Sequence, residues 1–460
     1  MTSPRLASRP APAPQRPYVF PEVRRLSVAG GEVVAAHLPG QPLAWLGVML
    51  GGGALAEPAP AAGVPLDGLS RATASLLDEG TEHYTADEFG AAVESLGGHW
   101  GVDSGWQSTK VTIDLPVSRA AAGAGLLAEA VRRPAFRETD TRRFLGDLAS
   151  AKREQFARPG IRAQQALRGA LYGEQARYGR LAGGTPESAE ALDGELVRAF
   201  HAQWLRGPGV LLVAADLDLV DLEALAAEVF ADAATGNPST PNAGAPLPDP
   251  TRLAIADRPG AVQSTLRIGH PVLTRTELAA SGVDIVALRV ASTILGGSFS
   301  SRLNQELREV KGYTYGISSG YTMGRERGQF GIRGSVRTDV TGASLVDLWK
   351  EIEGMRANPM GAAELGRVRN AQLLSLPGLF DTNLAVVAGY AGNWASGQPL
   401  SAITDLPKKY GAVTSASALK AAQQHLDPAQ LIVVAVGDKA KVQAQLEAIG
   451  RKPEVRSAAE

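Results

Sequence analysis

An eight-residue pattern occurs twice in this 460-residue chain, and the two copies lie 215 positions apart. The first copy is HWGVDSGW at 99–106, and the second is TYGISSGY at 314–321. Aligned positions are identical or chemically close, as in the pair Trp100 and Tyr315. Each copy follows a segment with a helical pattern and then a glycine. A distant internal repeat of this kind indicates a duplicated structural unit, which strongly limits the folds that the chain can adopt.

A segment rich in proline, glycine and asparagine divides the chain near its middle. The stretch GNPSTPNAGAPLPDP at 236–250 has no apolar period and is typical of a linker. It separates residues 20–235 from residues 251–452, which we predict to be an N-terminal and a C-terminal domain. Residues 1–19 are rich in proline and alanine, and this composition predicts a disordered arm.

The two predicted domains show the same order of secondary-structure patterns. The repeated pattern opens a strand region in each, further helices follow, and a buried strand closes the unit, GVLLVAADLD at 209–218 and QLIVVAVGD at 430–438. Thr85, with Glu88 three residues later, predicts the capped start of the helix before the first copy. We therefore predict an α+β fold of two tandem homologous domains, each a mostly antiparallel sheet packed with helices. The alternative is that the matches are generic, because many α+β domains end in apolar strands.

The composition excludes several classes of function. A net charge of −1, with 44% hydrophobic and 20% charged residues, gives no electrostatic reason to expect nucleic acid or an anionic membrane as partner. The absence of cysteine excludes disulfides, thiol catalysis and thiolate–metal sites. The chain has no apolar run of about 18 residues and no apolar core of a secretory signal near its start. We therefore expect a cytoplasmic protein.

One stretch of the second domain carries a recognisable motif. SSRLNQELREVKGYTYGISSGY at 300–321 resembles the C-terminal-domain motif of the pitrilysin/insulin-degrading-enzyme superfamily of zinc peptidases. That motif is S-R-L-x-x-E-[IL]-R-E, a glycine, and a tyrosine seven residues after the second arginine. The segment GTPESAEALDGELVRAFHAQWLRGPGVLLVAADLD at 184–218 also resembles the family, and the resemblance runs from about residue 20 to 450. It implies that the two domains form half of a clamshell chamber.

The resemblance also locates a zinc motif that this chain has lost. Family members that bind zinc carry H-x-x-E-H, in which two histidines ligate the metal and the glutamate activates its bound water. The matching string is GLSRATASLLDEGT at 68–81, with Arg71, Ala74 and Ser75 at the three motif positions. Arginine does not lose its proton, alanine has no donor atom, and a serine hydroxyl is a poor zinc ligand. We therefore predict a degenerate motif and no metal in this chain.

Other residues offer little to replace the lost motif. The family's further glutamate ligand aligns loosely with Arg142–Phe144, with Asp147 nearby. The chain has six histidines, and no two of them lie within five residues of each other. We interpret His83 as a solvated loop residue and His99 as a partly buried structural residue.

The resemblance further implies that an arginine and a tyrosine of the C-terminal domain reach into the catalytic cavity. Residue by residue, these are Arg308 and Tyr315, whereas the first half has Val93 and Trp100 at the corresponding positions. An arginine is a fixed cation with a planar fork of donors, and a tyrosine hydroxyl donates to a developing oxyanion. The alternative is that Arg308 is a surface helix residue and Tyr315 an ordinary aromatic of a sheet.

These observations lead to a hypothesis and an alternative of another class. The chain is expected to be the non-zinc-binding subunit of a heterodimeric zinc metallopeptidase, inactive alone, whose homologous partner supplies H-x-x-E-H and zinc and whose substrates are peptides. The glycine-rich MLGGGALAEP at 49–58 is a candidate sheet edge for strand addition by a substrate. The alternative is a catalytically silent structural or peptide-binding homologue, like the core subunits of the bc1 complex. A stand-alone zinc peptidase is disfavoured because no other H-x-x-E-H or H-E-x-x-H occurs in the sequence.

Overall fold

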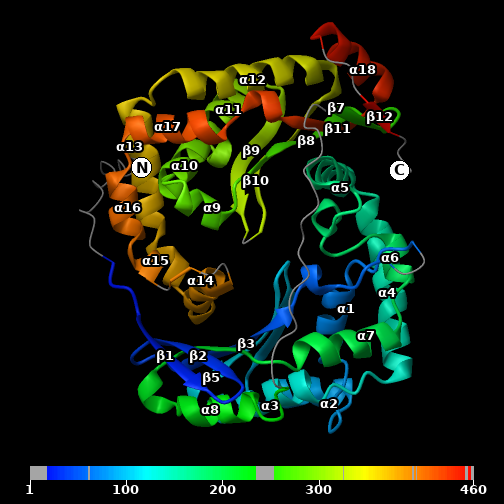
Figure 1. The fold of residues 1–460 in the computed structure, drawn as a ribbon, viewed down its shortest axis with the longest axis vertical. Coiled ribbons are helices and arrows are strands. Elements are labelled where there is room, and N and C mark those ends of the chain that lie inside the picture. The colour runs from blue at the N-terminus through cyan, green and yellow to red at the C-terminus, as the bar shows by residue number, and fades with distance from the viewer. Residues whose placement is uncertain are drawn as a thin grey trace, which may run out of the picture.

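The computed structural model describes residues 18–60, 63–234, 253–324, 326–395, 398–399, 401–450 and 454–456. Residues 1–17 of the predicted arm and the whole predicted linker lie outside the described residues. The described residues form two six-stranded sheets with the strand orders β1-β2-β6-β3-β5-β4 and β12-β7-β11-β8-β10-β9. Each sheet is mixed and mostly antiparallel, since parallel pairs join only β2 to β6 in the first and β7 to β11 and β12 in the second. The predicted α+β class is confirmed (Figure 1).

The first sheet and its helices come from the N-terminal half of the chain. The strands are β1 (Glu22–Val28), β2 (Gly31–His37), β3 (Leu43–Gly52), β4 (His99–Ser104), β5 (Ser108–Pro116) and β6 (Gly209–Ala215). The α-helices are α1 (Leu69–Ser75), α2 (Ala86–Ser95), α3 (Ala120–Arg132), α4 (Glu138–Phe156), α5 (Pro159–Tyr172), α6 (Pro186–Glu190), α7 (Gly194–Phe200) and α8 (Leu222–Val229). Shorter helical segments are η1 (Ala54–Ala56), η2 (Val117–Arg119), η3 (Arg177–Gly179), η4 (His201–Leu205) and η5 (Leu217–Leu219).

The second sheet and its helices come from the C-terminal half. The strands are β7 (Leu253–Asp257), β8 (Gln263–Val272), β9 (Thr314–Met323), β10 (Gly328–Arg337), β11 (Ile432–Gly437) and β12 (Glu454–Arg456). The α-helices are α9 (Arg275–Ala280), α10 (Ile285–Ser292), α11 (Arg302–Asn304), α12 (Thr341–Ala357), α13 (Ala362–Ser375), α14 (Asn383–Ala395), α15 (Ser401–Thr404), α16 (Leu406–Ala412), α17 (Ser415–His425) and α18 (Lys439–Ala448). Shorter helical segments are η6 (Thr293–Gly297), η7 (Gln305–Val310), η8 (Thr338–Val340), η9 (Pro377–Phe380) and η10 (Pro428–Gln430).

The two halves repeat one another in strand order. From the second position onward, β2-β6-β3-β5-β4 corresponds to β7-β11-β8-β10-β9. The two copies of the repeated pattern begin in β4 and β9, which are the outermost strands at the same end of each order. Val102 pairs with Val111 across the first hairpin, whereas Ile317, which the sequence repeat aligns with Val102, pairs with Gly334 across the second. Because Gly334 corresponds to Ile113, the pattern in β9 is displaced by two residues, next to the register shift between Gly334 and Val336. The sequence repeat is therefore a repeat of structure, as predicted.

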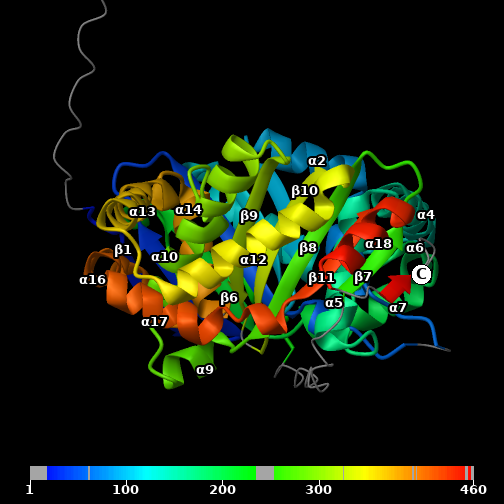
Figure 2. The same ribbon diagram turned by 90° about the horizontal axis from the view of Figure 1, so that it is seen from above.

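The central strands β6 and β11 are buried on both faces, which explains their continuous apolar runs. One face of each strand packs on the core of its own half. The other face is covered by a helix from the opposite half, α14 on the first sheet and α5 on the second (Figure 1). On β6, Leu212 and Ala214 pack with Val387 and Tyr390 of α14. Figure 2 shows α12 lying across the outside of the second sheet.

The prediction that residues 49–58 form a sheet edge for substrate is wrong. Met49 to Gly52 end strand β3, which lies inside the sheet between β6 and β5, and Ala54–Ala56 form the buried helix η1. The glycines serve close packing instead. Gly52 has a φ of +82°, and a Cβ there would lie 2.5 Å from the Cβ of Trp204. The outermost strands of this end of the two sheets are β4 and β9.

Among the described residues, no single helix is long and apolar enough to cross a membrane. Residues Ala362–Phe380 and Asn383–Asn393 meet the length and composition of a span as a pair, with a bend of 110° between them.

Acid is expected to destabilise the fold through His201. Burial lowers the pKa of this imidazole to about 4, and its Nε2 lies 2.8 Å from the carbonyl of Val131. Between about pH 6.5 and pH 4, His201 is protonated in the unfolded chain and neutral in the folded chain. The free energy of unfolding therefore falls as the pH drops through this range, by up to about 3 kcal/mol. Urea unfolding of the wild type and His201→Gln across this range measures the effect, and the variant is expected to lose less stability toward acid.

A second buried group, Asp78, changes the free energy of unfolding in the opposite direction over the same pH range. Burial raises the pKa of Asp78 to about 6, so its contribution to stability is lost as the pH rises through about 6. Asp78→Asn is therefore the matched control, because it removes this opposing change and steepens the acid loss. Equal pH dependence in the wild type and His201→Gln would contradict the role of His201.

Candidate functional site

Helix α1 carries the three residues predicted to occupy a degenerate zinc motif, and its amphipathic pattern decides where they point. Leu69 and Ala72 are buried in the core of the first half, and Ala74 is 1% exposed. Arg71 is exposed and Ser75 is half-buried. The helix ends at Ser75.

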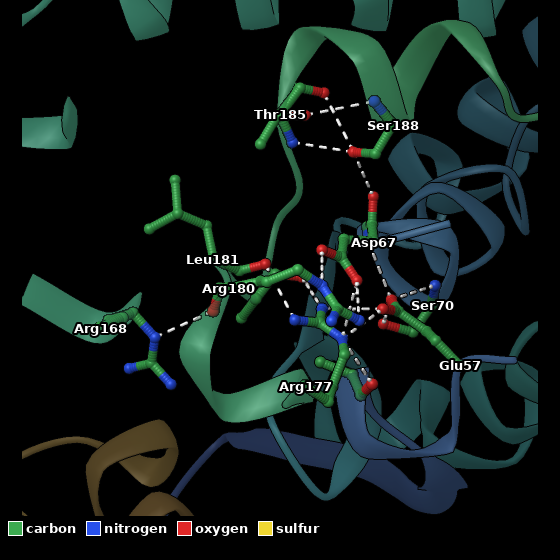
Figure 3. Close-up of polar contacts among 12 residues, drawn as sticks. Glu57, Asp67, Ser70, Arg168, Arg177, Arg180, Leu181, Thr185 and Ser188 are labelled. Carbon is green, nitrogen blue, oxygen red and sulfur yellow. Dashed lines mark hydrogen bonds and ion pairs between the residues drawn. The ribbon is translucent and has the colours of Figure 1, made fainter. Parts of the chain in front are cut away.

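A buried carboxylate holds the start of α1. Glu57 Oε1 accepts hydrogen bonds from the backbone N–H of Gly68 at 3.1 Å, the backbone N–H of Ser70 at 3.0 Å and the hydroxyl of Ser70 at 2.8 Å. The side chain of Glu57 is 0% exposed. It satisfies N–H groups that have no partner inside the helix, and its charge suits the positive end of the helix dipole. The direction of α1 is therefore fixed at its first turn (Figure 3).

Two arginines from the η3 region complete this network. Arg177 donates to Glu57 Oε2 from Nε at 2.9 Å and from Nη2 at 2.7 Å, and it lies 3.2 Å from Asp67. Arg180 pairs with the two oxygens of Asp67 at 2.7 and 3.1 Å. Burial raises the pKa of Glu57, and the Arg177 charge opposes that rise. We call Glu57, Asp67, Arg177 and Arg180 the buried ion network (Figure 3).

Helix α1 faces α4 across a cavity of about 490 Å³. Arg71 and Ser75 line it from α1, and Phe144, Leu148 and Lys152 line it from α4. The polar side chains among these residues are the Ser75 hydroxyl and the cations of Arg71 and Lys152, and Ala74 is buried. Zinc needs deprotonated nitrogen, sulfur or carboxylate donors, so these residues do not fit the metal.

Arg142, Arg143 and Phe144 align with the family's further glutamate. Of these three, only Phe144 is among the described residues that line the cavity. Arg142 lies against Glu138, and Arg143 pairs with Glu79 at 2.6 Å. Two turns further along α4, Lys152 extends into the cavity instead. Burial lowers the pKa of Lys152, and the charge of Arg71 lowers it further. No sequence pattern pointed to Lys152, because the rotation of α4 about its axis depends on packing.

The histidines near the degenerate motif have ordinary polar partners. His83 is exposed, as predicted, and its Nδ1 lies 3.0 Å from Glu129. The expectation that His99 is partly buried is wrong. Its side chain is 82% exposed and lies 3.2 Å from Asp114 on the neighbouring strand, because β4 is an edge strand.

Among the described residues, one group of metal-ligand types lies close together, namely His37, Asp216 and Asp218. Asp216 accepts hydrogen bonds from two backbone N–H groups of adjacent turns, and His37 accepts one. The second half builds the same turns with Asp438 and Asp257, which accept the corresponding backbone N–H groups without a histidine. The arrangement is therefore explained by turn formation.

Arg308 lies in η7, close to the predicted helix end, and its guanidinium is largely enclosed. Its Cζ lies 3.3 Å from the centroid of the Phe299 ring, and its Nε donates to Glu309 at 2.9 Å. The Arg308 side chain is 14% exposed, whereas Phe299 is 77% exposed. The sequence did not predict this contact with Phe299.

Tyr315 is the second residue of β9 and is 93% exposed. No hydrogen bond to its hydroxyl, and none between it and Arg308, is present within the described part of the chain. Gly312, with a φ of +63°, makes the turn between the two elements. Trp100, its partner in the sequence repeat, is half-buried and packs edge-on against Phe89, with 5.0 Å between ring centroids.

Comparisons with known proteins agree with this architecture. The family described as the peptidase M16 inactive domain matches residues 191–372. An uncharacterized zinc protease of Streptomyces coelicolor is 27% identical over 381 residues, which cover 78% of each protein. Another, of Mycobacterium leprae, is 27% identical over 334 residues, covering 65% of each.

Solved structures share the fold. A peptidase M16 inactive domain from Pseudomonas fluorescens superposes with a TM-score of 0.81 at 23% identity, covering 90% of this chain and 98% of that one. A protease from Helicobacter pylori superposes with a TM-score of 0.79 at 16% identity, covering 91% and 100%. Residues 191–372 therefore match the peptidase M16 inactive domain, and the chain as a whole shares the fold of these solved structures.

Proposed function

We propose that the chain is the zinc-less subunit of a two-subunit metallopeptidase that hydrolyses peptides. A homologous partner would supply H-x-x-E-H and the metal, and this chain would supply one wall of the chamber and the donor Tyr315. The chain carries an inactive M16 peptidase-like domain. The residues at its own motif positions are Arg71, Ala74 and Ser75, and they offer no suitable ligands for zinc. Peptide hydrolysis by this chain alone is therefore not expected.

The observation that carries the proposal is the exposure of Tyr315. Its partner in the sequence repeat, Trp100, is likewise the second residue of its strand, and its ring packs against Phe89 of the helix beside it. Tyr315 instead presents its ring and hydroxyl to solvent, and it does so on an outermost strand. An exposed donor on such a strand is suited to contact an extended peptide.

Tyr315 would act by hydrogen bonding. During attack on a peptide bond, negative charge develops on the carbonyl oxygen, and a fixed donor aimed at that oxygen stabilises the transition state more than the ground state. This stabilisation depends on position and not on covalent connection, so the donor can belong to a different chain from the nucleophile. Arg308 would hold the adjacent substrate backbone after its guanidinium exchanges Glu309 for substrate carbonyls, with Phe299 as the stacking platform.

One observation favours the alternative, a catalytically silent structural or peptide-binding homologue. Arg308 is already paired with Glu309 and stacked on Phe299, so its donors are largely used within the chain. A protein that only binds peptides would not need the donors of Arg308 to be available for stabilising a reaction intermediate. The two functions differ in whether the assembled complex turns over substrate.

The test is to purify the tagged chain from its native cells, identify what co-purifies, and assay the complex on unfolded peptides with and without a zinc chelator. The proposal expects an equimolar partner with H-x-x-E-H, hydrolysis by the complex, and loss of hydrolysis with chelator. The chain alone serves as the control and is expected to be inactive. Recovery of the chain by itself or with unrelated proteins would overturn the heterodimer, and an equimolar partner without hydrolysis would favour the silent homologue.

A further inference from the structure

We propose that the cavity between α1 and α4 binds a carboxylate of a peptide, held between Arg71 and Lys152. The inference rests on the proposed function to the extent that the ligand is a peptide. It assigns the degenerate motif a role of its own, in which the position of a metal cation is taken by side-chain cations that attract an anion.

The two cations converge on one point. A Cβ placed on Gly183 would lie 3.0 Å from Lys152 Nζ and 3.7 Å from Arg71 Nη1, so the bare glycine leaves room beside both nitrogens. Among the described residues, no carboxylate pairs with either cation. The hydrogen bond of Lys152 goes to the amide oxygen of Gln155 at 3.3 Å. Two neighbouring cations without an anion repel each other, and a bound carboxylate relieves this repulsion.

The acidic residues lining the cavity are already engaged. Asp67 is buried and bonded to Arg177 and Arg180 in the buried ion network. Glu154 is largely exposed and lies 3.3 Å from Arg158, which is the other cation on the cavity wall. Neither acid neutralises Arg71 or Lys152. The cavity therefore retains positive charge at the point where the two cations meet.

The site is fixed before any ligand arrives. Glu57 and its partners fix the first turn of α1, and Arg71 stands on that turn. Burial and the Arg71 charge lower the pKa of Lys152, which agrees with an unneutralised pair. An anion placed between them would raise that pKa, because it favours the charged form of the amine.

The chemistry of the walls defines the ligand. The arginine fork matches the two oxygens of a carboxylate, and the lysine adds a point charge. Phe144 and Leu148 give the cavity an apolar wall that suits the aliphatic part of the same residue. Both a C-terminal carboxylate and an aspartate or glutamate side chain present this chemistry, and the experiment separates them.

The experiment compares fluorescence anisotropy of three labelled unfolded peptides binding to the full chain. One peptide has a free C-terminus and no acidic side chain, one is its C-terminal amide, and one is the amide with a single internal glutamate. We expect at least tenfold tighter binding of a carboxylate-bearing peptide than of the plain amide. The advantage should vanish in Arg71→Gln and in Lys152→Gln and persist in Arg119→Gln, which removes one exposed arginine elsewhere. A preference for the first peptide identifies the C-terminus as the source, and a preference for the third identifies the side chain.

A second measurement keeps the two proposals distinguishable. The Lys152 signal of the reductively ¹³C-methylated chain, assigned with Lys152→Arg, is titrated with pH in chloride, in acetate and with each peptide. The inference expects the pKa of Lys152 to rise with a carboxylate present. If peptides bind equally well with and without carboxylates and this pKa does not move, the inference fails and peptide binding stands. If the pKa responds to acetate but no peptide binds, the carboxylate site stands and peptide binding fails.

Discussion

Arg177→Met is expected to lower the free energy of unfolding by about 3–5 kcal/mol, the range for breaking a buried ion pair by removing one partner. The guanidinium of Arg177 donates two hydrogen bonds to Glu57 and lies 3.2 Å from Asp67, and the side chain of Glu57 is fully buried. Methionine keeps much of the volume but leaves Glu57 without its counter-charge. The start of α1 depends on Glu57, so the loss is expected to spread to the helix that carries Arg71. Urea unfolding followed by circular dichroism measures the change.

An exposed ion pair provides the matched control. Arg24→Met removes the partner of Glu22, and both side chains of that pair are largely exposed, so a change of about 0–1 kcal/mol is expected. Adding Glu57→Gln to Arg177→Met removes the uncompensated charge and should restore part of the loss. A loss for Arg177→Met no larger than that for Arg24→Met would show that the buried ion network does not stabilise the fold.

Tyr315→Phe is expected to lower turnover of the assembled peptidase by about 10²–10³-fold, the effect of removing one oxyanion donor. The side chain is 93% exposed and makes no packing contact that phenylalanine would lose by lacking the hydroxyl, so assembly and stability should be unchanged. The KM for peptides should change little, because the hydrogen bond strengthens mainly in the transition state. Steady-state kinetics on the purified complex, with size-exclusion chromatography to check assembly, measures both effects.

The repeat supplies the control for this variant. Trp100→Phe alters the aromatic residue that the sequence repeat aligns with Tyr315, and its ring packs on Phe89. It is expected to cost some stability and to leave turnover per assembled complex unchanged. Wild-type turnover by Tyr315→Phe would remove the oxyanion role and leave the silent homologue as the better account.

Local signals in the sequence predicted the repeated fold because they recur in both halves. The capping pair Thr85 and Glu88 forms as predicted, with the Glu88 backbone N–H donating to Thr85 and the Thr85 backbone N–H donating to Glu88. Gly312 makes the expected turn. The repeated pattern marks equivalent strands of the two sheets. Such features depend on residues within a few positions of each other.

The features that the sequence did not predict depend on distant packing. The glycines near Gly52 suggested a sheet edge, but their purpose is the approach of Trp204 from 152 positions away. Lys152 reaches the cavity because of how α4 is rotated against α1, and the stacking of Phe299 on Arg308 depends on the path of the preceding loop. The bounds of α13 to α17, between residues 358 and 429, were likewise not predicted.

Each half of the chain provides a helix that covers the sheet of the other half, so the two halves do not separate easily. Each central strand has one face covered by a helix that the other half provides, α14 over β6 and α5 over β11. A polypeptide cut between the two halves would yield two fragments, each with an apolar sheet face uncovered and a helix lacking its sheet. Such fragments would be poorly soluble apart and complementary when mixed, so cleavage between the halves would leave a nicked protein that stays together and behaves as one folding unit.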